Sequence, residues 1–484
     1  MVTDMKRVIL ALVMLAMALD GCRVQAEPSV DVKVNSKEVL APVSRLFWGT
    51  NFLFWVEDDE ALVDGKIEQS MKDLPVRILR YPGGTVADNF HWKTNMLDNR
   101  NMFPYEEGPE QSDFDEFMAF CGRVHAEPML VVNTQSWFLK DDIEGGAKEA
   151  ADWVRYCKDK GYNVRYWEIG NETYWHTVMT ASEYGELANV YAKAMKAVDP
   201  DIILSVNGGW DINMTGNKER TDPSLWKEMK QGYLDVSSVK ESRIFKEKVE
   251  GAVRRPWTEG NEKWWKNLIT TCGDNVEMIS VHWYYHDNNI RHIEKKLNEL
   301  KSYVSELKGG KEFLLCLSEF NCNTENPDKR LVGFAESVGR FLNVGTDIAC
   351  FWPFRIGGGT SLKSNRSMMS LKEKNGQYPY CIFQLFQENL TGNMVKCECG
   401  DGVYAFASAD KDRMTVVVSG RNLKEFKDVV LDTGIRGKNV QAFSYTLDKE
   451  TVGLAETPLE FVKKGRMISL GVAPDSFVMI TINK

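Results

Sequence analysis

The sequence predicts an α/β fold, a (β/α)₈ TIM barrel that is followed by a C-terminal antiparallel β-sandwich. Three observations support this fold class. Eight short apolar segments recur at strand–helix spacing, helical patterns lie between several of them, and after about residue 386 short strands follow one another without a helical pattern. The chain has 484 residues, which is long enough for such a barrel and one smaller domain.

The eight predicted barrel strands share one composition. Each is short, apolar and rich in branched or aromatic residues, as a parallel strand that is buried on both faces should be. They are Leu46–Asn51, Val76–Arg80, Pro128–Asn133, Val164–Ile169, Ile202–Asn207, Val276–Trp283, Phe313–Phe320 and Ile348–Phe354.

Two of the intervening segments are clear helix candidates. Ala181–Ala197 has apolar residues at helical spacing and stops before Asp199-Pro200, and Asp113–His125 has the same pattern. The connection from Trp210 to Asn275 is too long for a structureless loop in a compact domain, so we expect additional helices there, beside the cleft.

The predicted domains are a barrel over residues 46–385 and a β-sandwich over residues 386–484. Gly, Asp and Asn turns divide the strands of the sandwich. A further strand within residues 27–45 is predicted to join it, because both ends of the chain lie outside the barrel. The sandwich strands are Gly402–Ala409, Met414–Ser419, Val429–Leu431, Val440–Tyr445 and Phe477–Ile482.

Residues 1–26 have the pattern of an export signal. Lys6 and Arg7 precede the apolar run Val8–Leu19, and Val24-Gln25-Ala26 offers a small-residue cleavage site. Leu19-Asp20-Gly21-Cys22 also resembles a bacterial lipobox, in which Asp20 fits poorly. We therefore expect an exported protein and keep two alternatives open, a lipid anchor at Cys22 and a released periplasmic or secreted form. No later segment has the ~18 uninterrupted apolar residues of a membrane span.

The composition narrows the classes of partner and cofactor. A net charge of -9 and a pI near 5.5 disfavour a nucleic-acid partner, which would call for a basic surface. Cys397-Glu398-Cys399 has no accompanying Cys-x-x-Cys pair, and Cys316 and Cys350 lie in strand-like runs as expected of buried thiols. The markers of zinc peptidases and serine esterases are missing from the sequence. We therefore expect no metal and no organic cofactor.

Two carboxylates stand at the ends of predicted barrel strands. Glu172 follows strand four, after Gly170-Asn171, and Glu319 lies near the end of strand seven. A single glutamate at a strand end is commonly solvated or ion-paired, but the ends of parallel barrel strands meet at one rim. There the two carboxylates can flank one glycosidic bond, one as acid/base and the other as nucleophile. Glu168 is interpreted instead as a paired structural carboxylate inside the barrel.

These motifs resemble those of clan A glycoside hydrolases, and most closely those of family 51, the α-L-arabinofuranosidases. Arg80-Tyr81-Pro82-Gly83-Gly84 is similar to that family's Arg-x-Pro-Gly-Gly segment after strand two, and Ser280-Val281-His282-Trp283-Tyr284 resembles its Ser-x-His-Tyr-Tyr segment on strand six. Two segments depart from the family. Ser318-Glu319-Phe320 replaces the usual Asp-Glu-Trp, and Thr173 follows Glu172 where the family has Trp-Gly. Families 39, 30 and 79 share the catalytic layout.

The resemblance implies a role for each matching residue. Glu172 would protonate the leaving oxygen and later activate water, while Glu319 would attack the anomeric carbon. Arg80 would hydrogen-bond Glu319 and keep it ionised. Asn171 would hold the hydroxyl next to the anomeric carbon.

Further side chains are predicted to contact the nucleophile or the sugar. His282 and Tyr284 would contact Glu319, and Trp352 would form the floor of the sugar subsite. Asn51 and Trp175 would line the cleft. The alternatives for His282 and Trp352 are a core histidine and plain barrel packing.

The sequence therefore predicts an exported retaining glycoside hydrolase that acts on a polysaccharide or oligosaccharide, with α-L-arabinofuranosidase as the first choice. Another clan A specificity, such as xylosidase, glucuronidase or endo-glycanase, is the nearest alternative. A catalytically inactive carbohydrate-binding protein is the alternative from a different class.

Overall fold

The computed structural model describes residues 31–97, 111–174, 179–210, 219–220, 253–254, 260–287, 289–355, 367–369, 376–400 and 402–484. Within these ranges no helix is long and apolar enough to cross a membrane. The predicted signal segment lies outside them.

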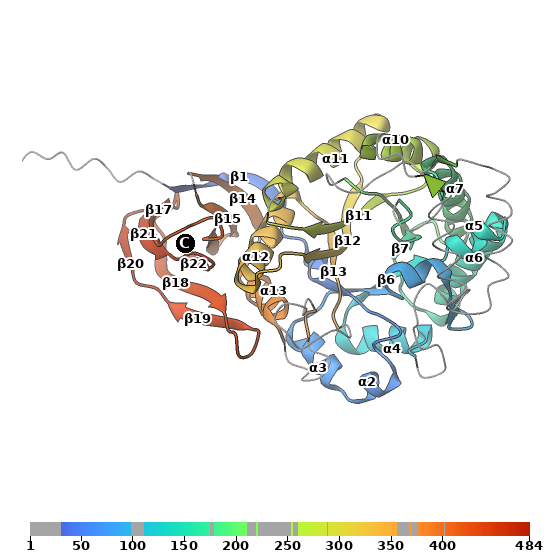
Figure 1. Cartoon of the computed structure of the whole chain (residues 1–484), viewed down its shortest axis with the longest axis horizontal. Coiled ribbons are helices and arrows are strands. Elements are labelled where there is room, and N and C mark those ends of the chain that lie inside the picture. Colours follow the sequence, from blue (N-terminus) through green and yellow to red (C-terminus); the bar gives the residue numbers. More distant parts are fainter. Residues whose placement is uncertain are drawn as a thin grey trace, which may run out of the picture.

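Eight parallel strands close into a barrel, which confirms the predicted fold class (Figure 1). Each strand overlaps one predicted segment and pairs with its neighbours in chain order, and the last strand pairs with the first through Phe351 and Thr50. All their C-terminal ends therefore meet at one rim. The strands are β2 (Gly49–Asn51), β3 (Ile78–Tyr81), β6 (Glu127–Val132), β7 (Tyr166–Ile169), β8 (Ile203–Asn207), β11 (Met278–Tyr285), β12 (Leu314–Cys322) and β13 (Ile348–Phe351).

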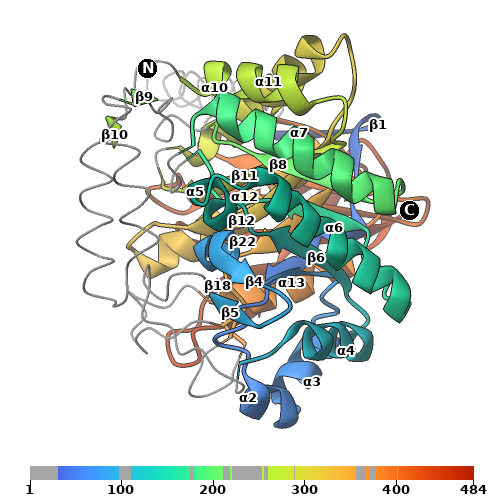
Figure 2. The same ribbon diagram turned by 90° about the vertical axis from the view of Figure 1, so that its right-hand side faces the viewer.

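Helices surround the barrel. They are α2 (Asp59–Val63), α3 (Lys66–Asp73), α4 (Phe114–Val124), α5 (Gln135–Leu139), α6 (Ile143–Lys160), α7 (Ala181–Val198), α10 (Gly260–Cys272), α11 (Ile293–Leu307), α12 (Pro327–Val344) and α13 (Tyr378–Asn389). Figure 2 shows α6 and α7 side by side on the outside of the sheet. The helix α7 begins with a capping box between Thr180 and Glu183. A second capping box, of Asp113 and Glu116, begins α4.

The helix α10 lies in the long connection after β8, where additional helices were expected. It packs against α7 and buries Trp264 and Trp265 completely. The indole N–H of Trp264 donates to the Asn207 carbonyl oxygen, and that of Trp265 donates to the Gly209 carbonyl oxygen. Both bonds fasten α10 to the C-terminal end of β8. Most of the rest of this connection lies outside the described residues.

The barrel interior is filled by side chains. Met129, Met278, Cys316 and Cys350 are fully buried and contact one another in one apolar cluster. The two cysteines are free, as their place in apolar strands predicts. A packed interior leaves the rim as the place where a substrate can bind.

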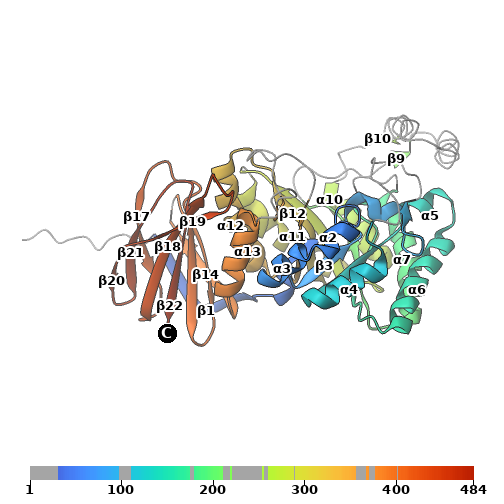
Figure 3. The same cartoon turned by 90° about the horizontal axis from the view of Figure 1, so that it is seen from below.

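A ten-stranded, mostly antiparallel sheet forms the C-terminal region (Figure 3). The N-terminal strand β1 (Val32–Pro42) lies within it, between β14 and β17. Strands from both halves of the sheet share one apolar core, so the sheet packs on itself as a sandwich. The other strands are β14 (Asn393–Cys399), β15 (Tyr404–Ala409), β16 (Arg413–Ser419), β17 (Lys427–Asp432), β18 (Lys438–Leu447), β19 (Leu454–Pro458), β20 (Phe461–Lys464), β21 (Met467–Val472) and β22 (Phe477–Asn483).

A buried polar network joins the sandwich to the barrel. Glu336 of α12 is 1% exposed and accepts hydrogen bonds from Arg340 and from Arg421, which lies just after β16. The Arg340 guanidinium lies 3.6 Å from the ring centroid of Tyr404 on β15. Burial raises the pKa of Glu336, but the two arginines outweigh it and hold that pKa below its usual value. The sandwich is therefore held to the barrel through charged groups that stay paired.

Candidate active site

Glu172 stands on a tight turn just after β7. Gly170 and Glu172 both have a left-handed backbone, with φ of 72° and 43°. Glycine is required at position 170 because a Cβ there would lie 2.6 Å from the Thr134 hydroxyl oxygen. The turn carries Glu172 across the barrel rim, where the residue is 8% exposed.

Glu319 reaches the same rim through an irregularity in β12. The pairing of β11 and β12 shifts by one residue, since Val281 pairs with Leu317 but His282 pairs with Glu319. Ser318 is the additional residue, as in a β-bulge. Side chains in a regular strand alternate between its two faces. Because of the bulge, both Ser318 and Glu319 contact the polar groups inside the barrel.

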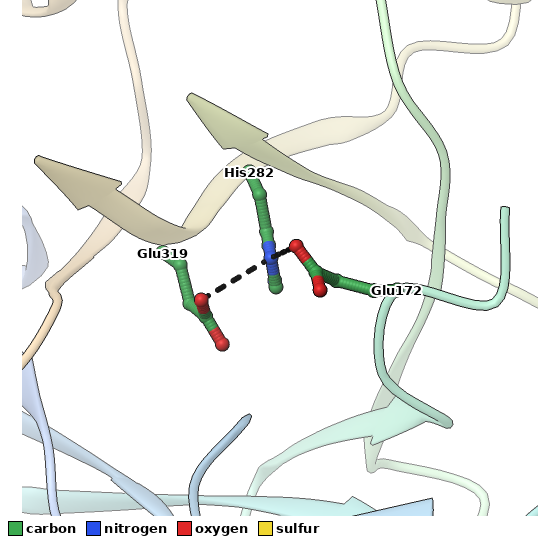
Figure 4. Close-up of side chains that lie close together, drawn as sticks. All are labelled: Glu172, His282 and Glu319. Carbon is green, nitrogen blue, oxygen red and sulfur yellow. Dashed lines mark hydrogen bonds and ion pairs between the residues drawn. The ribbon is translucent and has the colours of Figure 1, made fainter. Parts of the chain in front are cut away.

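The two carboxylates face each other across His282 (Figure 4). The His282 Nδ1 atom lies 2.9 Å from Glu172 Oε1 and 3.4 Å from Glu319 Oε2. One oxygen of each carboxylate and a ring nitrogen all lie within 4.8 Å of one another. Retaining glycosidases place their carboxyl groups about 5–5.5 Å apart, and inverting enzymes about 6.5–9.5 Å. The separation therefore suits direct attack by one carboxylate.

Arg80, from β3, is the central cation of the site and is fully buried. Its guanidinium donates to Glu168 Oε2 at 2.7 Å and to Glu319 Oε1 at 3.1 Å. The same group donates to Asn51 Oδ1 at 2.8 Å and to Asn171 Oδ1 at 2.6 Å. One side chain thus aligns the ends of β2, β7 and β12. Ser318 also donates to Glu168, which is the paired interior carboxylate that the sequence predicts.

Glu319 is held as a hydrogen-bond acceptor. The Tyr284 hydroxyl donates to its Oε2 atom at 2.7 Å, and Arg80 occupies Oε1. Burial raises the pKa of Glu319, and the charge of Glu172 adds to that rise. The charges of His282 and Arg80 and the Tyr284 hydrogen bond oppose it. These groups favour the ionised form that a nucleophile needs.

His282 lies between two acids. Burial lowers its pKa, but the carboxylates of Glu319 and Glu172 outweigh burial and raise the pKa above its ordinary value. Its Nδ1 atom lies within hydrogen-bond distance of Glu172 Oε1, at 2.9 Å. His282 is fully buried but belongs to the site, because it contacts both candidate catalytic groups.

The remaining predicted site residues differ in their location and their contacts. Asn51 is buried and donates to the Ser318 carbonyl oxygen at 3.0 Å, so it braces the strand ends. Among the described residues, the buried Asn171 Nδ2 atom has no hydrogen-bond partner. Trp352 is half-buried after β13 and packs over Gly84, where a Cβ would lie 2.5 Å from the indole ring. Trp175 lies outside the described residues.

Sequence reasoning did not single out two buried groups that hold the Glu172 turn. Asp88 Oδ1 accepts from the Asn171 amide at 3.0 Å, and Asn207 Oδ1 accepts from the Thr173 amide at 2.9 Å. Asn207 is the last residue of β8. A polar residue at the end of a predicted strand is the sequence signal that could have identified it. Asp88 lies four residues after the Arg80–Gly84 motif, and its role was not predicted.

The trio Glu172, His282 and Glu319 also presents three atoms of the types that bind metal ions. However, Arg80 and Tyr284 already occupy the two oxygens of Glu319. A metal ion would add positive charge next to the Arg80 guanidinium. The arrangement therefore fits an acid/base and nucleophile pair better than a metal site.

Comparisons with known proteins show similarity to α-L-arabinofuranosidases. Residues 70–248 match the family model described as the alpha-L-arabinofuranosidase 1 domain. The alpha-L-arabinofuranosidase C of Emericella nidulans is 32% identical over 173 residues, covering 30% of this chain and 33% of that protein. An intracellular exo-alpha-(1->5)-L-arabinofuranosidase of Acetivibrio thermocellus is 30% identical over 167 residues, covering 30% of this chain and 32% of that protein. The chain thus spans about a third of the length of the curated relatives it matches.

Solved structures share the whole architecture. An α-L-arabinofuranosidase from Thermotoga maritima, solved as an arabinose complex, superposes with a TM-score of 0.67 at 18% identity, covering 94% of this chain and 100% of that one. CelM2, a bifunctional glucanase-xylanase from a metagenome library, has a TM-score of 0.62 at 16% identity and covers 95% of this chain and 100% of its own. The fold is therefore that of these barrel-and-sandwich proteins, and the resemblance to family 51 of clan A is confirmed.

Proposed function

We propose that this protein is a retaining glycoside hydrolase, and that it removes α-L-arabinofuranosyl units from a polysaccharide or oligosaccharide. The observation that carries the proposal is the pair Glu172 and Glu319, which face each other within 4.8 Å at the barrel rim. The arginine and the tyrosine donate hydrogen bonds to Glu319, and the histidine lies between the two carboxylates.

In the first step, an oxygen of Glu319 attacks the anomeric carbon and forms a covalent ester. The glycosidic bond breaks, and Glu172 gives its proton to the departing oxygen. In the second step, the Glu172 carboxylate takes a proton from water. The water oxygen bonds to the anomeric carbon and Glu319 departs as a carboxylate, which Arg80 and Tyr284 stabilise.

The arabinofuranosyl assignment is supported by the match over residues 70–248 and by the names of the curated relatives. This region includes Arg80 and Glu172 but not Glu319. The segment around Glu319 has the sequence Ser318-Glu319-Phe320 where family 51 has Asp-Glu-Trp. That departure favours, as the second candidate, another clan A specificity such as xylosidase, glucuronidase or endo-glycanase.

A panel of 4-nitrophenyl glycosides and plant polysaccharides distinguishes these candidates. We expect release of 4-nitrophenol from the α-L-arabinofuranoside and of terminal arabinose from the polymers. Oligosaccharide ladders would establish an endo-enzyme instead. Sugar binding without turnover of any substrate would establish a carbohydrate-binding protein.

The variant Glu319→Gln tests the nucleophile. Turnover should be lost while sugar binding, measured by calorimetry, is retained. The exposed control Glu450→Gln should behave like the wild type. Normal hydrolysis by Glu319→Gln would overturn the assignment of the nucleophile.

We also propose that the protein is exported. The basic and apolar pattern of residues 6–19 supports this. The mass of the mature protein, purified from its native host, distinguishes two forms. Cleavage after Ala26 gives a released protein, and a lipid-modified Cys22 at the new N-terminus gives an anchored one. An unprocessed chain beginning at residue 1 would contradict export.

A further inference from the structure

The turn that carries Glu172 needs support from outside its own strand. Glu172 adopts a left-handed backbone that residues with a side chain rarely adopt. Such conformations persist where neighbouring groups hold them. A change in the backbone conformation of this turn would move the proton-donating carboxyl relative to the leaving oxygen.

Asp88 holds the middle of this turn. It lies in the short 3-10 helix η3 (Gly84–Asn89) and is completely buried. Its Oδ1 atom accepts two hydrogen bonds, from the Thr134 hydroxyl at 2.8 Å and from the Asn171 amide at 3.0 Å. That amide lies directly between the two left-handed residues, Gly170 and Glu172.

A second support comes from the opposite side. The Asn207 side chain accepts from the Thr173 amide at 2.9 Å and donates to the Gly170 carbonyl oxygen at 2.9 Å. The turn is therefore clamped on both sides of Glu172, by Asp88 from the segment after β3 and by Asn207 from β8.

The clamp on the Asp88 side requires an acceptor oxygen at Oδ1. Burial raises the pKa of Asp88 to about 7, and the nearby charges of Glu168 and Glu172 add to the rise. Oδ1 takes both hydrogen bonds, and among the described residues Oδ2 has no partner. A proton on Oδ2 leaves Oδ1 free to accept both bonds. Asparagine reproduces that shape and that hydrogen-bonding pattern.

Resting on the proposed function, we propose that Asp88 is a positioning residue for the acid/base catalyst. Through the Asn171 amide it sets where Glu172 delivers its proton. The nucleophile depends on other contacts, because Glu319 is held by Arg80 and by Tyr284 of β11. Loss of Asp88 should therefore weaken proton donation more than nucleophilic attack.

Aryl α-L-arabinofuranosides with good and poor leaving groups test this inference. With Asp88→Ala, kcat/KM should fall about 10- to 100-fold for poor leaving groups, which depend on proton donation, and less than about threefold for dinitrophenyl substrates. Asp88→Asn should restore kcat/KM to within about threefold of the wild type, because it keeps the acceptor.

Asp347→Ala is the matched control. Asp347 accepts from the Leu315 amide at 2.8 Å, at the opposite end of the barrel. Asp347→Ala likewise removes a carboxylate that accepts a hydrogen bond from a backbone amide of a barrel strand. It should therefore lower the stability of the protein without changing how kcat/KM depends on the leaving group. If Asp88→Ala does not fold, Thr134→Val removes one of the two donors to Asp88 and should produce the same selective loss, at about threefold to tenfold.

The outcomes separate the two proposals. An equal loss for good and poor leaving groups, or a failure of Asp88→Asn to restore activity, overturns the positioning role and leaves the hydrolase assignment standing. A wild-type enzyme that cleaves no glycoside overturns the proposed function and this inference with it.

Discussion

Replacing Tyr284 by phenylalanine removes one hydrogen bond to the nucleophile and leaves the ring in place. The Tyr284 hydroxyl lies 2.7 Å from Glu319 Oε2 and donates to it. A hydrogen bond to a charged group contributes about 1.5–3 kcal/mol. In the second step Glu319 departs as a carboxylate, and Tyr284→Phe should slow that step about 10- to 100-fold. With an activated aryl substrate, the slower second step should appear as a burst of phenol release.

The same substitution has a defined effect on the pH profile. The Tyr284 hydrogen bond lowers the pKa of Glu319 and so opposes the effect of burial. Removing the bond raises that pKa further, and a larger fraction of Glu319 is protonated at a given pH. Activity that needs the ionised nucleophile is then lost at a higher pH as the medium is acidified. The acidic limb of kcat/KM should therefore move to higher pH.

Tyr285→Phe is the matched control on the same strand. The Tyr285 hydroxyl accepts from Ser337 at 2.8 Å and is not bonded to Glu319. This variant also loses a buried hydrogen bond, but its pH profile and its second step should match the wild type. If the acidic limb of Tyr284→Phe stays in place or moves to lower pH, the assignment of Tyr284 to the nucleophile is wrong.

Three further substitutions test other parts of the molecule. Glu172→Ala should lower kcat/KM about 10²- to 10⁴-fold for poor leaving groups and much less for activated ones, and an equal loss for both would contradict the acid role. Arg80→Lys should lower kcat/KM at least about 100-fold, because a lysine ammonium group cannot replace a planar guanidinium that donates to four acceptors. Near-normal kinetics of this variant would contradict that role of Arg80. Glu336→Gln should lower the free energy of unfolding by about 3–5 kcal/mol, measured by chemical denaturation, with kcat of the folded enzyme unchanged. Because Arg421 and Arg340 lower the pKa of Glu336, this difference should shrink as the pH falls through that lowered pKa, and a difference that grows in acid would refute the pairing.

The barrel could be predicted because its strands are buried on both faces. Such strands give continuous apolar runs, and Ile203–Asn207 and Ile348–Phe351 are two examples. The strands β19 and β20 were not predicted. They lie at opposite ends of the ten-stranded sheet, and Glu456, Lys463 and other residues in them are exposed. An edge strand with so little apolar surface has no clear periodic signal.

The site could be predicted only where its residues lie at strand ends. Glu172 and Glu319 were found because parallel strands bring their ends to one rim, and Arg80 was found through the family resemblance. The position of His282 between the two carboxylates depends on a bulge in β12, which no local pattern reveals. Asp88 was missed because its partners lie at positions 134 and 171, and only the folded chain brings them together.

Mass spectrometry of the trapped enzyme tests most directly whether Glu172 and Glu319 act together. In Glu172→Ala the second step lacks its base, so an activated aryl glycoside should leave a glycosyl group on the protein after rapid acid quenching. Peptide mapping should place that group on Glu319. A product of inverted configuration without any adduct, or an adduct on a different carboxylate, would contradict the double-displacement mechanism.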